Sequence, residues 1–215
     1  MKSSSLRRRA LVAGSFVFAV LAASCAVAAE KKSPPPAASK PAKTPDVVYV
    51  PTPQPVVDKM LELAEVKAGD IVYDLGCGDG RIVVTAAKKF GVKAIGYDID
   101  PQRVKEAREN VKKAGVEHLV RIEEADVFTL DLTGASVITL YLLPALNVRL
   151  MPQLAKMKPG SRIVSHNFDM RGAKPVSTTP VQIPPGESEN AFFEEDGVHT
   201  VYKWVVPWEA EKPAN

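Results

Sequence analysis

Three alternating glycines, placed between a mostly apolar segment and a helical pattern, restrict the possible folds of this chain more than any other feature. The apolar segment, residues 70–75, ends at Gly76, and Gly78 and Gly80 follow before a helical pattern over 80–90. Glycine adopts left-handed backbone conformations easily, and it lets the backbone approach a neighbour where a Cβ atom would collide. A buried strand that turns at once into a helix predicts the first βα unit of a parallel sheet.

The rest of residues 46–208 alternates strand and helix patterns. Helices are predicted over 54–66, 80–90, 101–114 and 145–157, and strands over 70–75, 93–97, 119–123, 136–142 and 162–166. After residue 169 the alternation stops, and two β-like segments, 176–183 and 198–206, predict a C-terminal hairpin. The order predicts a doubly wound, mostly parallel α/β sheet that ends in an antiparallel hairpin.

The spacing of the glycines distinguishes between two classes of nucleotide-binding loop. A dinucleotide-binding loop has the pattern Gly-x-Gly-x-x-Gly, which would require a third glycine where this chain has Arg81. The observed pattern has Asp74, Gly76, Gly78 and Gly80 at alternate positions. This pattern resembles motif I of the class I S-adenosylmethionine-dependent methyltransferases. In that family the loop passes close to the amino-acid part of the cofactor, and the acid helps to hold the methionine ammonium.

The resemblance covers residues 49–169 and implies a Rossmann-like class I methyltransferase fold, with a seven-stranded sheet and helices on both faces. It implies S-adenosyl-L-methionine as the cofactor. The cofactor-binding residues that we expect are Asp74, Gly76, Cys77, Gly78, Gly80, Asp98, Ile99, Asp126, Val127 and Tyr141. No metal site is expected, because two cysteines and three widely separated histidines offer no ligand spacing.

Two further carboxylates follow predicted strands. Asp98 ends the second strand, 22 residues after Gly76, where a carboxylate can accept hydrogen bonds from both ribose hydroxyls. Asp100 is expected to cap the helix that begins at Pro101. Asp126 follows the third strand, where the resemblance implies an acid that meets the adenine amino group.

Three segments in combination narrow the resemblance within the class. Val-Pro-Thr at 50–52, Asp-Leu-Gly-Cys-Gly-Asp-Gly-Arg-Ile-Val at 74–83 and Leu-Leu-Pro at 142–144 resemble the small mitochondrial-type protein-lysine N-methyltransferases, whose known targets are membrane proteins, the ATP synthase c subunit and the adenine nucleotide translocase. Tyr141 lies in a segment that departs from the Asn/Asp-Pro-Pro-Tyr pattern of DNA and glutamine methyltransferases, which disfavours those substrates. Tyr141 is the candidate catalytic residue and would orient the amine through its hydroxyl or ring. The alternative is an aromatic side chain that only packs at a strand end.

The leading functional hypothesis is methyl transfer to a lysine side chain of a protein, with a membrane-associated protein as the expected partner. A small-molecule or lipid-like acceptor is one alternative. Another is a non-catalytic cofactor-binding domain of the same fold, against which the intact glycine loop, Asp98 and Asp126 argue. No nucleic-acid partner is expected: residues 1–29 carry four of the 28 basic residues and no acid, which leaves 24 basic against 25 acidic residues in the remainder.

Residues 1–29 predict an export segment. Basic residues stop at Arg9, and the uncharged run 10–29 ends in small residues that offer an Ala-x-Ala cleavage site. Cleavage would give a periplasmic protein, whereas an uncleaved run is long enough to anchor the chain on the far side of the cytoplasmic membrane. A mitochondrial presequence is disfavoured because the arginines are clustered. Residues 30–45 predict a Pro/Ala/Lys-rich linker, and 209–215 predict a disordered tail.

Overall fold

The computed structural model describes residues 47–183 and 197–211. The predicted export segment and linker, residues 1–45, lie outside these ranges. Within the described ranges, no helix has the length and apolar character needed to cross a membrane. All elements given below belong to the C-terminal compact unit of the chain.

The described chain alternates strands and helices in the predicted order. The helices are α1 (Gln54–Leu63), α2 (Arg81–Phe90), α3 (Pro101–Ala114) and α4 (Pro144–Leu154), with one 3₁₀ helix, η1 (Val127–Thr129). The strands are β1 (Ile71–Leu75), β2 (Lys93–Asp98), β3 (Val120–Glu124), β4 (Val137–Leu140), β5 (Arg162–His166), β6 (Ser177–Gln182) and β7 (Val198–Val205). Helix α3 and strand β5 begin and end at the residues predicted for them.

The strands form one seven-stranded sheet with the order β3-β2-β1-β4-β5-β7-β6. Strands β1 to β5 pair in parallel, and β7 runs antiparallel to both β5 and β6. This arrangement confirms the predicted Rossmann-like fold and its C-terminal hairpin. The strand order reverses between β1 and β4, and in open α/β sheets such a switch point opens a crevice outside the carboxyl ends of the strands.

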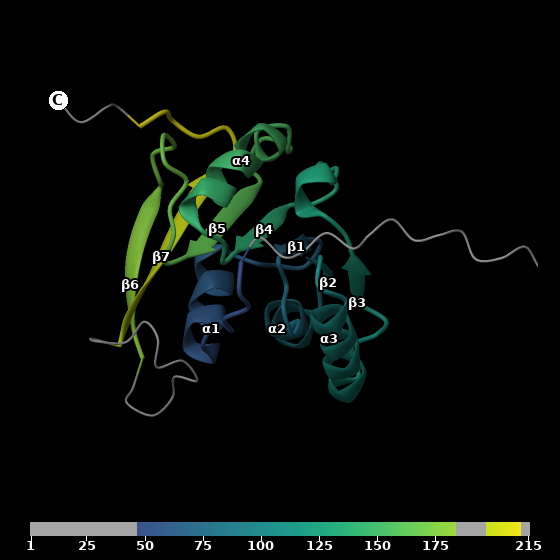
Figure 1. Ribbon diagram of the computed structural model, residues 1–215. Coiled ribbons are helices and arrows are strands. Elements are labelled where there is room, and N and C mark those ends of the chain that lie inside the picture. Colours follow the sequence, from purple (N-terminus) through teal and green to yellow (C-terminus); the bar gives the residue numbers. More distant parts are fainter. Residues whose placement is uncertain (1–46, 184–196, 212–215) are drawn as a thin grey trace, which may run out of the picture. The chain divides into compact units, whose positions relative to one another are not determined.

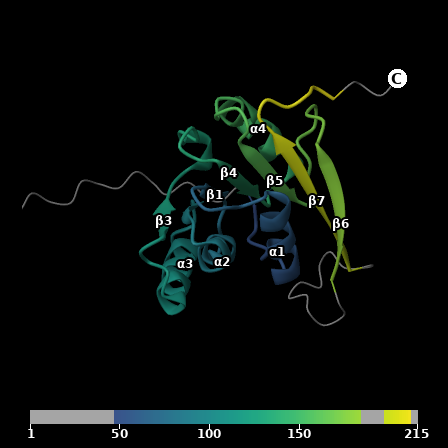
Figure 2. The same cartoon turned by 180° about the vertical axis from the view of Figure 1, so that it is seen from behind.

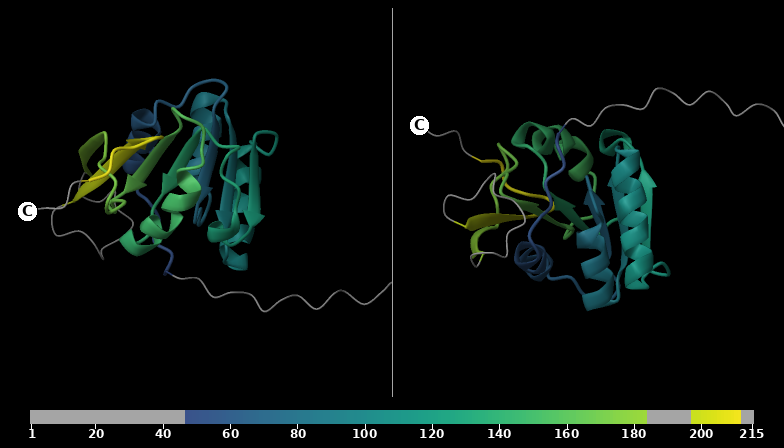
Figure 3. Two further views of the ribbon diagram at one scale, coloured as in Figure 1. Left: turned by 90° about the horizontal axis from the view of Figure 1, so that it is seen from above. Right: turned by 60° about the horizontal axis from the view of Figure 1, so that its bottom comes forward.

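Helices cover both faces of the sheet and create two cores. Helices α1, α2 and α3 lie side by side on one face, and α4 and η1 lie over the other (Figures 1, 2 and 3). The first core contains Val57, Val83 and Ala107, one from each of the three helices. The second contains Leu150 of α4 and Trp204 of β7. Because all five side chains are fully buried, removal of apolar surface from water stabilises both faces.

Helix α4 and the C-terminus differ from their predictions. Helix α4 was predicted over 145–157 but ends at Leu154, because the N–H groups of Lys156 and Met157 bond three residues back in a tighter turn. Backbone pairing continues past residue 208: Ala210 bridges to Ala173, and Glu211 N donates to a carbonyl of the same neighbouring segment. The described part of the predicted tail, 209–211, is therefore paired rather than disordered.

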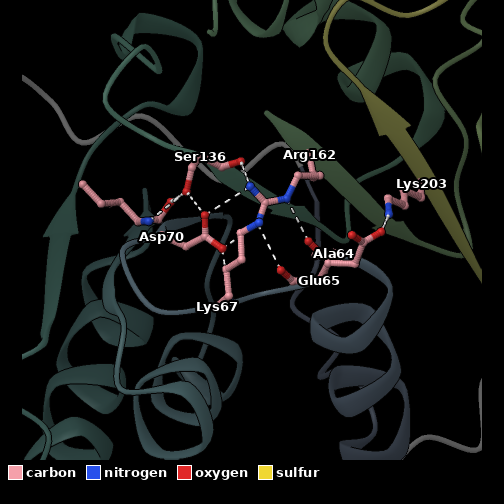
Figure 4. Close-up of polar contacts among 8 residues, drawn as sticks. Ala64, Glu65, Lys67, Asp70, Ser136, Arg162 and Lys203 are labelled. Carbon is pink, nitrogen blue, oxygen red and sulfur yellow. Dashed lines mark hydrogen bonds and ion pairs between the residues drawn. The ribbon is translucent and has the colours of Figure 1, made fainter. Parts of the chain in front are cut away.

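Three polar residues, Asp70, Ser136 and Arg162, contact one another at the amino ends of the strands. We call them the amino-edge cluster (Figure 4). Arg162 donates to both carboxylate oxygens of Asp70, and the Ser136 hydroxyl donates to Asp70 Oδ1 at 2.7 Å. Arg162 also donates to the carbonyls of Ala64 and Glu65 at the end of α1. Burial alone raises the pKa of Asp70, but hydrogen bonds from Arg162 and Ser136 hold it below its usual value.

Candidate active site

The glycine loop joins β1 to α2 through left-handed backbone conformations. The φ angle is +81° at Gly76, +53° at Gly78 and +78° at Gly80, a region that favours glycine. The amides of Gly76 and Cys77 both donate to the Tyr97 carbonyl, at 2.8 and 2.9 Å. The loop is therefore tied to the end of β2 as well as to β1.

The absence of a Cβ at these glycines makes room for other parts of the chain. A Cβ on Gly78 would lie 2.1 Å from the Tyr49 ring, and one on Gly80 would lie 3.1 Å from Ala107 of α3. A Cβ on Gly76 would lie 3.0 Å from Leu142. The close approach that the sequence predicted is present, but in this structure the neighbours are side chains of the protein itself.

One pocket lies at the carboxyl ends of β1, β2 and β4, where the strand order reverses. Eight of the ten predicted cofactor-binding residues line it, and they are Asp74, Gly76, Cys77, Asp98, Ile99, Asp126, Val127 and Tyr141. Gly78 and Gly80 do not line it, because Gly78 lies against Tyr49 and Gly80 packs on α3. The fold thus gathers residues from four separate loops around one cavity.

Two carboxyl groups in the pocket wall give it its electrostatic character. Asp74 is buried and accepts a hydrogen bond of 2.7 Å from the Thr139 hydroxyl, and burial raises the pKa of Asp74 to about 7. Asp98 accepts from the amides of Gly78 and Asp100, at 2.8 and 3.0 Å, and burial raises its pKa as well. Among the described residues, neither carboxyl group has an ion-pair partner. The pocket therefore suits a ligand that carries positive charge and hydroxyl donors.

The third carboxylate, Asp126, lines the pocket and caps η1. Its Oδ1 accepts from Phe128 N at 3.1 Å. Asp100 caps α3 as predicted, because its Oδ1 accepts from Gln102 N at 2.8 Å. The sequence did not predict η1, which is a single turn too short to show a period.

A segment before α1 also lines the pocket, and sequence reasoning gave it no role. This segment, residues 47–52, contains the Val-Pro-Thr tripeptide. Arg81 forms an ion pair of 2.8 Å with Asp79 and donates to the Thr52 carbonyl at 2.9 Å. The Arg103 guanidinium lies 4.8 Å from the centre of the Tyr49 ring. These contacts hold the segment over the glycine loop, and the tripeptide was the only sequence signal for it.

Tyr141 is held by aromatic neighbours from the end of β5. Its ring centroid lies 3.9 Å from that of His166 and 5.9 Å from that of Phe168. Burial raises the pKa of Tyr141, so its hydroxyl stays protonated. Of the three histidines, His118 is exposed, whereas His166 and His199 are buried and hydrogen-bonded to each other. The sequence could not predict this pairing, because the two residues belong to β5 and β7, which are separated in the chain by β6.

Comparison with known proteins identifies relatives of this chain. Residues 74–177 match the family model of the ANTKMT methyltransferase domain. A protein-lysine N-methyltransferase of Saccharolobus islandicus is 46% identical over 166 residues, which cover 75% of this chain and 95% of that protein. An adenine nucleotide translocase lysine N-methyltransferase of Mus musculus is 33% identical over 133 residues, 61% of this chain and 57% of that protein. The chain thus spans little more than half the length of this animal relative.

A solved structure is similar over the same domain. The crystal structure of an RNA methyltransferase from Salinibacter ruber, in complex with S-adenosyl-L-homocysteine, is 45% identical in sequence and has a TM-score of 0.65. The match covers 77% of this chain and 99% of that one. That relative binds the demethylated product of the cofactor that the glycine spacing predicts.

Proposed function

Because this chain belongs to the class I S-adenosylmethionine-dependent methyltransferases, in the family of the protein-lysine N-methyltransferases, we propose that it methylates lysine side chains of a protein. The observation that carries the proposal is the 46% identity with the Saccharolobus enzyme, which extends over 95% of that protein. The animal relative, named for a lysine of the adenine nucleotide translocase, supports the same class of acceptor.

The family resemblance assigns each of the three pocket carboxylates to a different part of the cofactor. S-adenosylmethionine supplies an activated methyl group on a sulfonium that also raises the positive charge of the ligand. Asp74 would balance the methionine ammonium, and Asp98 would accept from the ribose hydroxyls. Asp126 would meet the adenine amino group, and the apolar residues Ile99 and Val127 line the same pocket.

The acceptor must arrive as a neutral amine. Its nitrogen lone pair forms the new N–CH₃ bond while the S–CH₃ bond breaks, so the protein mainly aligns donor and acceptor. Tyr141, at the carboxyl end of β4, would align the amine because its neutral hydroxyl oxygen can accept a hydrogen bond from an amine N–H. That contact leaves the nitrogen lone pair available to the methyl group.

The site of action follows from the export segment. We propose that residues 1–29 carry the domain across the cytoplasmic membrane and that its acceptor is a membrane-associated protein there. The cofactor is made in the cytoplasm, so it must reach the same compartment. Intact-mass measurement and cell fractionation test this directly: a mature N-terminus near Glu30 in the periplasm supports cleavage, and full-length protein in carbonate-washed membranes supports an anchor. Full-length protein in the cytoplasm would contradict export.

Methyl transfer to cell extracts tests the acceptor. The full chain is incubated with extract and cofactor labelled in the methyl group, and the product is divided into protein, RNA and small-molecule fractions. We expect label in protein, at lysine by mass spectrometry, and reduced labelling with Asp98→Ala at limiting cofactor. Label that ribonuclease removes would contradict the proposal and point to the class of acceptor for which the Salinibacter relative is named. Label confined to small molecules would favour the alternative acceptor.

A further inference from the structure

The second half of α4 carries two polar side chains that have no part in the reaction described above. Gln153 is half-buried, and its Nε2 donates to the Val127 carbonyl at 3.3 Å and to the Leu130 carbonyl at 2.8 Å. The Arg149 guanidinium lies 3.7 Å from the centre of the Phe128 ring. Because Arg149 and Gln153 are four residues apart, both project from the face of α4 that contacts η1.

The two hydrogen bonds from Gln153 hold both ends of the η1 turn. Val127 is the first residue of η1 and Leu130 is its C-cap. Within the turn, Asp126 Oδ1 accepts from Phe128 N at 3.1 Å, and the Asp126 carbonyl accepts from Thr129 N at 3.0 Å. A single 3₁₀ turn has few hydrogen bonds of its own, so the bonds from α4 add to those that fix its place.

The η1 turn forms part of the pocket wall, whereas the α4 side chains that hold it do not. Asp126, Val127 and Phe128 line the pocket, and Arg149 and Gln153 lie behind them. The two α4 side chains can therefore influence a ligand only through η1. An ionised carboxylate accepts hydrogen bonds and donates none, so Asp126 can distinguish an amino group from a carbonyl oxygen at the same position of a base.

We propose that Gln153 is a positioning residue for adenine recognition, which holds η1 so that Asp126 faces the adenine amino group of the cofactor. The inference rests on the proposed function, in which Asp126 is assigned to that group. The exposed Arg149 supports the same turn through the Phe128 ring. Gln153 does not touch the cofactor, so its substitution should change the preference for the base, and only while Asp126 is present.

Binding of two nucleosides to the full-length protein tests this role without any acceptor. S-adenosyl-L-homocysteine carries the amino group, and S-inosyl-L-homocysteine carries a carbonyl oxygen in its place. We expect calorimetry to show that the wild type binds the first at least about 10-fold more tightly, because hydrogen bonds to a charged group are strong. Gln153→Met keeps the length of the side chain but has no N–H donor. In this variant the ratio of the two affinities should fall by at least about 3-fold.

Two substitutions in the pocket serve as controls. Asp126→Ala should abolish the preference between the two nucleosides, and Gln153→Met added to it should change the ratio no further, since both residues act through one interaction. Asp98→Ala should weaken both nucleosides equally and keep the wild-type ratio, because their ribose is the same. A wild-type ratio in Gln153→Met, or a further change of the ratio in the double variant relative to Asp126→Ala, would overturn the proposal.

Arg149→Met provides a second test if Gln153→Met does not fold, because it changes an exposed side chain. Loss of the contact with the Phe128 ring should lower the affinity ratio by roughly 2-fold, and an unchanged ratio would then overturn the inference. Equal affinity of the wild type for both nucleosides would also overturn it, while leaving lysine methylation intact. Failure of the wild type to label protein would instead refute the proposed function and leave the preference for the base unaffected.

Discussion

Asp70 and Asp74 lie four residues apart at the two ends of β1, yet their surroundings shift the two pKa values in opposite directions. Asp70 is bonded to Arg162 and Ser136 in the amino-edge cluster, and its pKa is lowered. Asp74 is buried at the pocket with one hydroxyl donor, Thr139, and its pKa is raised to about 7. A single strand thus has a carboxylate paired with an arginine at one end and a carboxyl group without an ion-pair partner among the described residues at the other.

The difference indicates that the amino edge of the sheet contributes to stability, whereas the carboxyl edge is suited to bind a ligand. A buried charge is costly unless it is paired, so the amino edge gains stability from partners that belong to the protein. The carboxyl edge keeps Asp74 and Asp98 without an ion pair among the described residues, and this state becomes favourable when a cationic ligand arrives. Perturbed carboxyl groups in a crevice are typical of functional sites for this reason.

The largest effect is expected from Arg162→Met, which removes the partner of Asp70 and leaves a buried carboxylate unpaired. The free energy of unfolding should fall by about 3–5 kcal/mol, as measured by urea denaturation of the full chain. Affinity of the folded protein for S-adenosylmethionine should not change, because the amino-edge cluster lies at the other end of the sheet. A loss of stability below about 1 kcal/mol would mean that the cluster acts as an ordinary surface ion pair.

Asp74→Asn tests the other end of β1, where the pKa of the carboxyl group is raised rather than lowered. Because folding raises the pKa of Asp74 from 3.8 to about 7, the folded chain binds the proton more tightly than the unfolded chain. Its contribution is therefore favourable at low pH and is lost as pH rises through this window, by about 1.4 kcal/mol for each unit between the two values. Denaturation at about pH 5 and about pH 8 should show the variant gaining stability relative to the wild type as pH rises.

Only the difference between the two proteins isolates this carboxyl group. His166, whose pKa is lowered to about 3, acts in the opposite direction, because the unfolded chain binds its proton more tightly and stability is lost as pH falls. This contribution is the same in wild type and Asp74→Asn and cancels in the difference. A difference that does not vary with pH would show that Asp74 is not the titrating group.

Substitution of Asp98 tests the carboxyl edge through the affinity of the protein for S-adenosylmethionine. Asp98→Ala should weaken S-adenosylmethionine binding by about 1.5–3 kcal/mol, the range for hydrogen bonds to a charged group. Asp98→Asn is the matched control, because it keeps one oxygen acceptor for the Gly78 amide while it removes the charge. Calorimetry should rank wild type, Asn and Ala in that order. Wild-type affinity in Asp98→Ala, or tighter binding of NAD than of S-adenosylmethionine by the wild type, would contradict the assignment.

The sequence predicted those parts of the molecule that depend on local pattern. The strand–glycine–helix unit, the bounds of α3 with its Asp100 cap, and the parallel order each follow from period, turn chemistry and spacing. Eight of the ten predicted pocket residues line the cavity for the same reason, since residues after parallel strands meet at one edge of the sheet.

The contacts between distant segments were not predictable. Gly78 and Gly80 make room for Tyr49 and Ala107, and no local pattern distinguishes a glycine that faces a ligand from one that faces another element. The pairing of His166 with His199 depends on the register of β5 against β7, which is set by the whole sheet. The amino-edge cluster likewise joins residues 92 positions apart.

The backbone provides a further contrast between the two edges, since each carries a left-handed residue that is not glycine. Glu65 has φ of +52° and follows α1 beside the amino-edge cluster, and Asn167 has φ of +57° and follows β5 at the carboxyl edge. Glu65 N donates to the Glu62 carbonyl and Val66 N to the Leu61 carbonyl. These bonds form a Schellman motif, in which position C′ favours glycine.

The smallest expected effect is that of Glu65→Gly. Relief of the left-handed strain should raise the melting temperature by about 2–4 °C, while the exposed Glu65 carboxylate loses its contact with Lys203. Glu65→Gln is the control, because it removes the same charge but keeps the strained backbone, so the difference between Gly and Gln reports the backbone alone. Asn167→Gly makes the same backbone change but also removes the side-chain acceptor of the Thr200 amide, so it should not raise the melting temperature. If both glycine variants raised the melting temperature equally, the Asn167 side chain would not compensate its left-handed backbone, and the two edges would not differ in this respect.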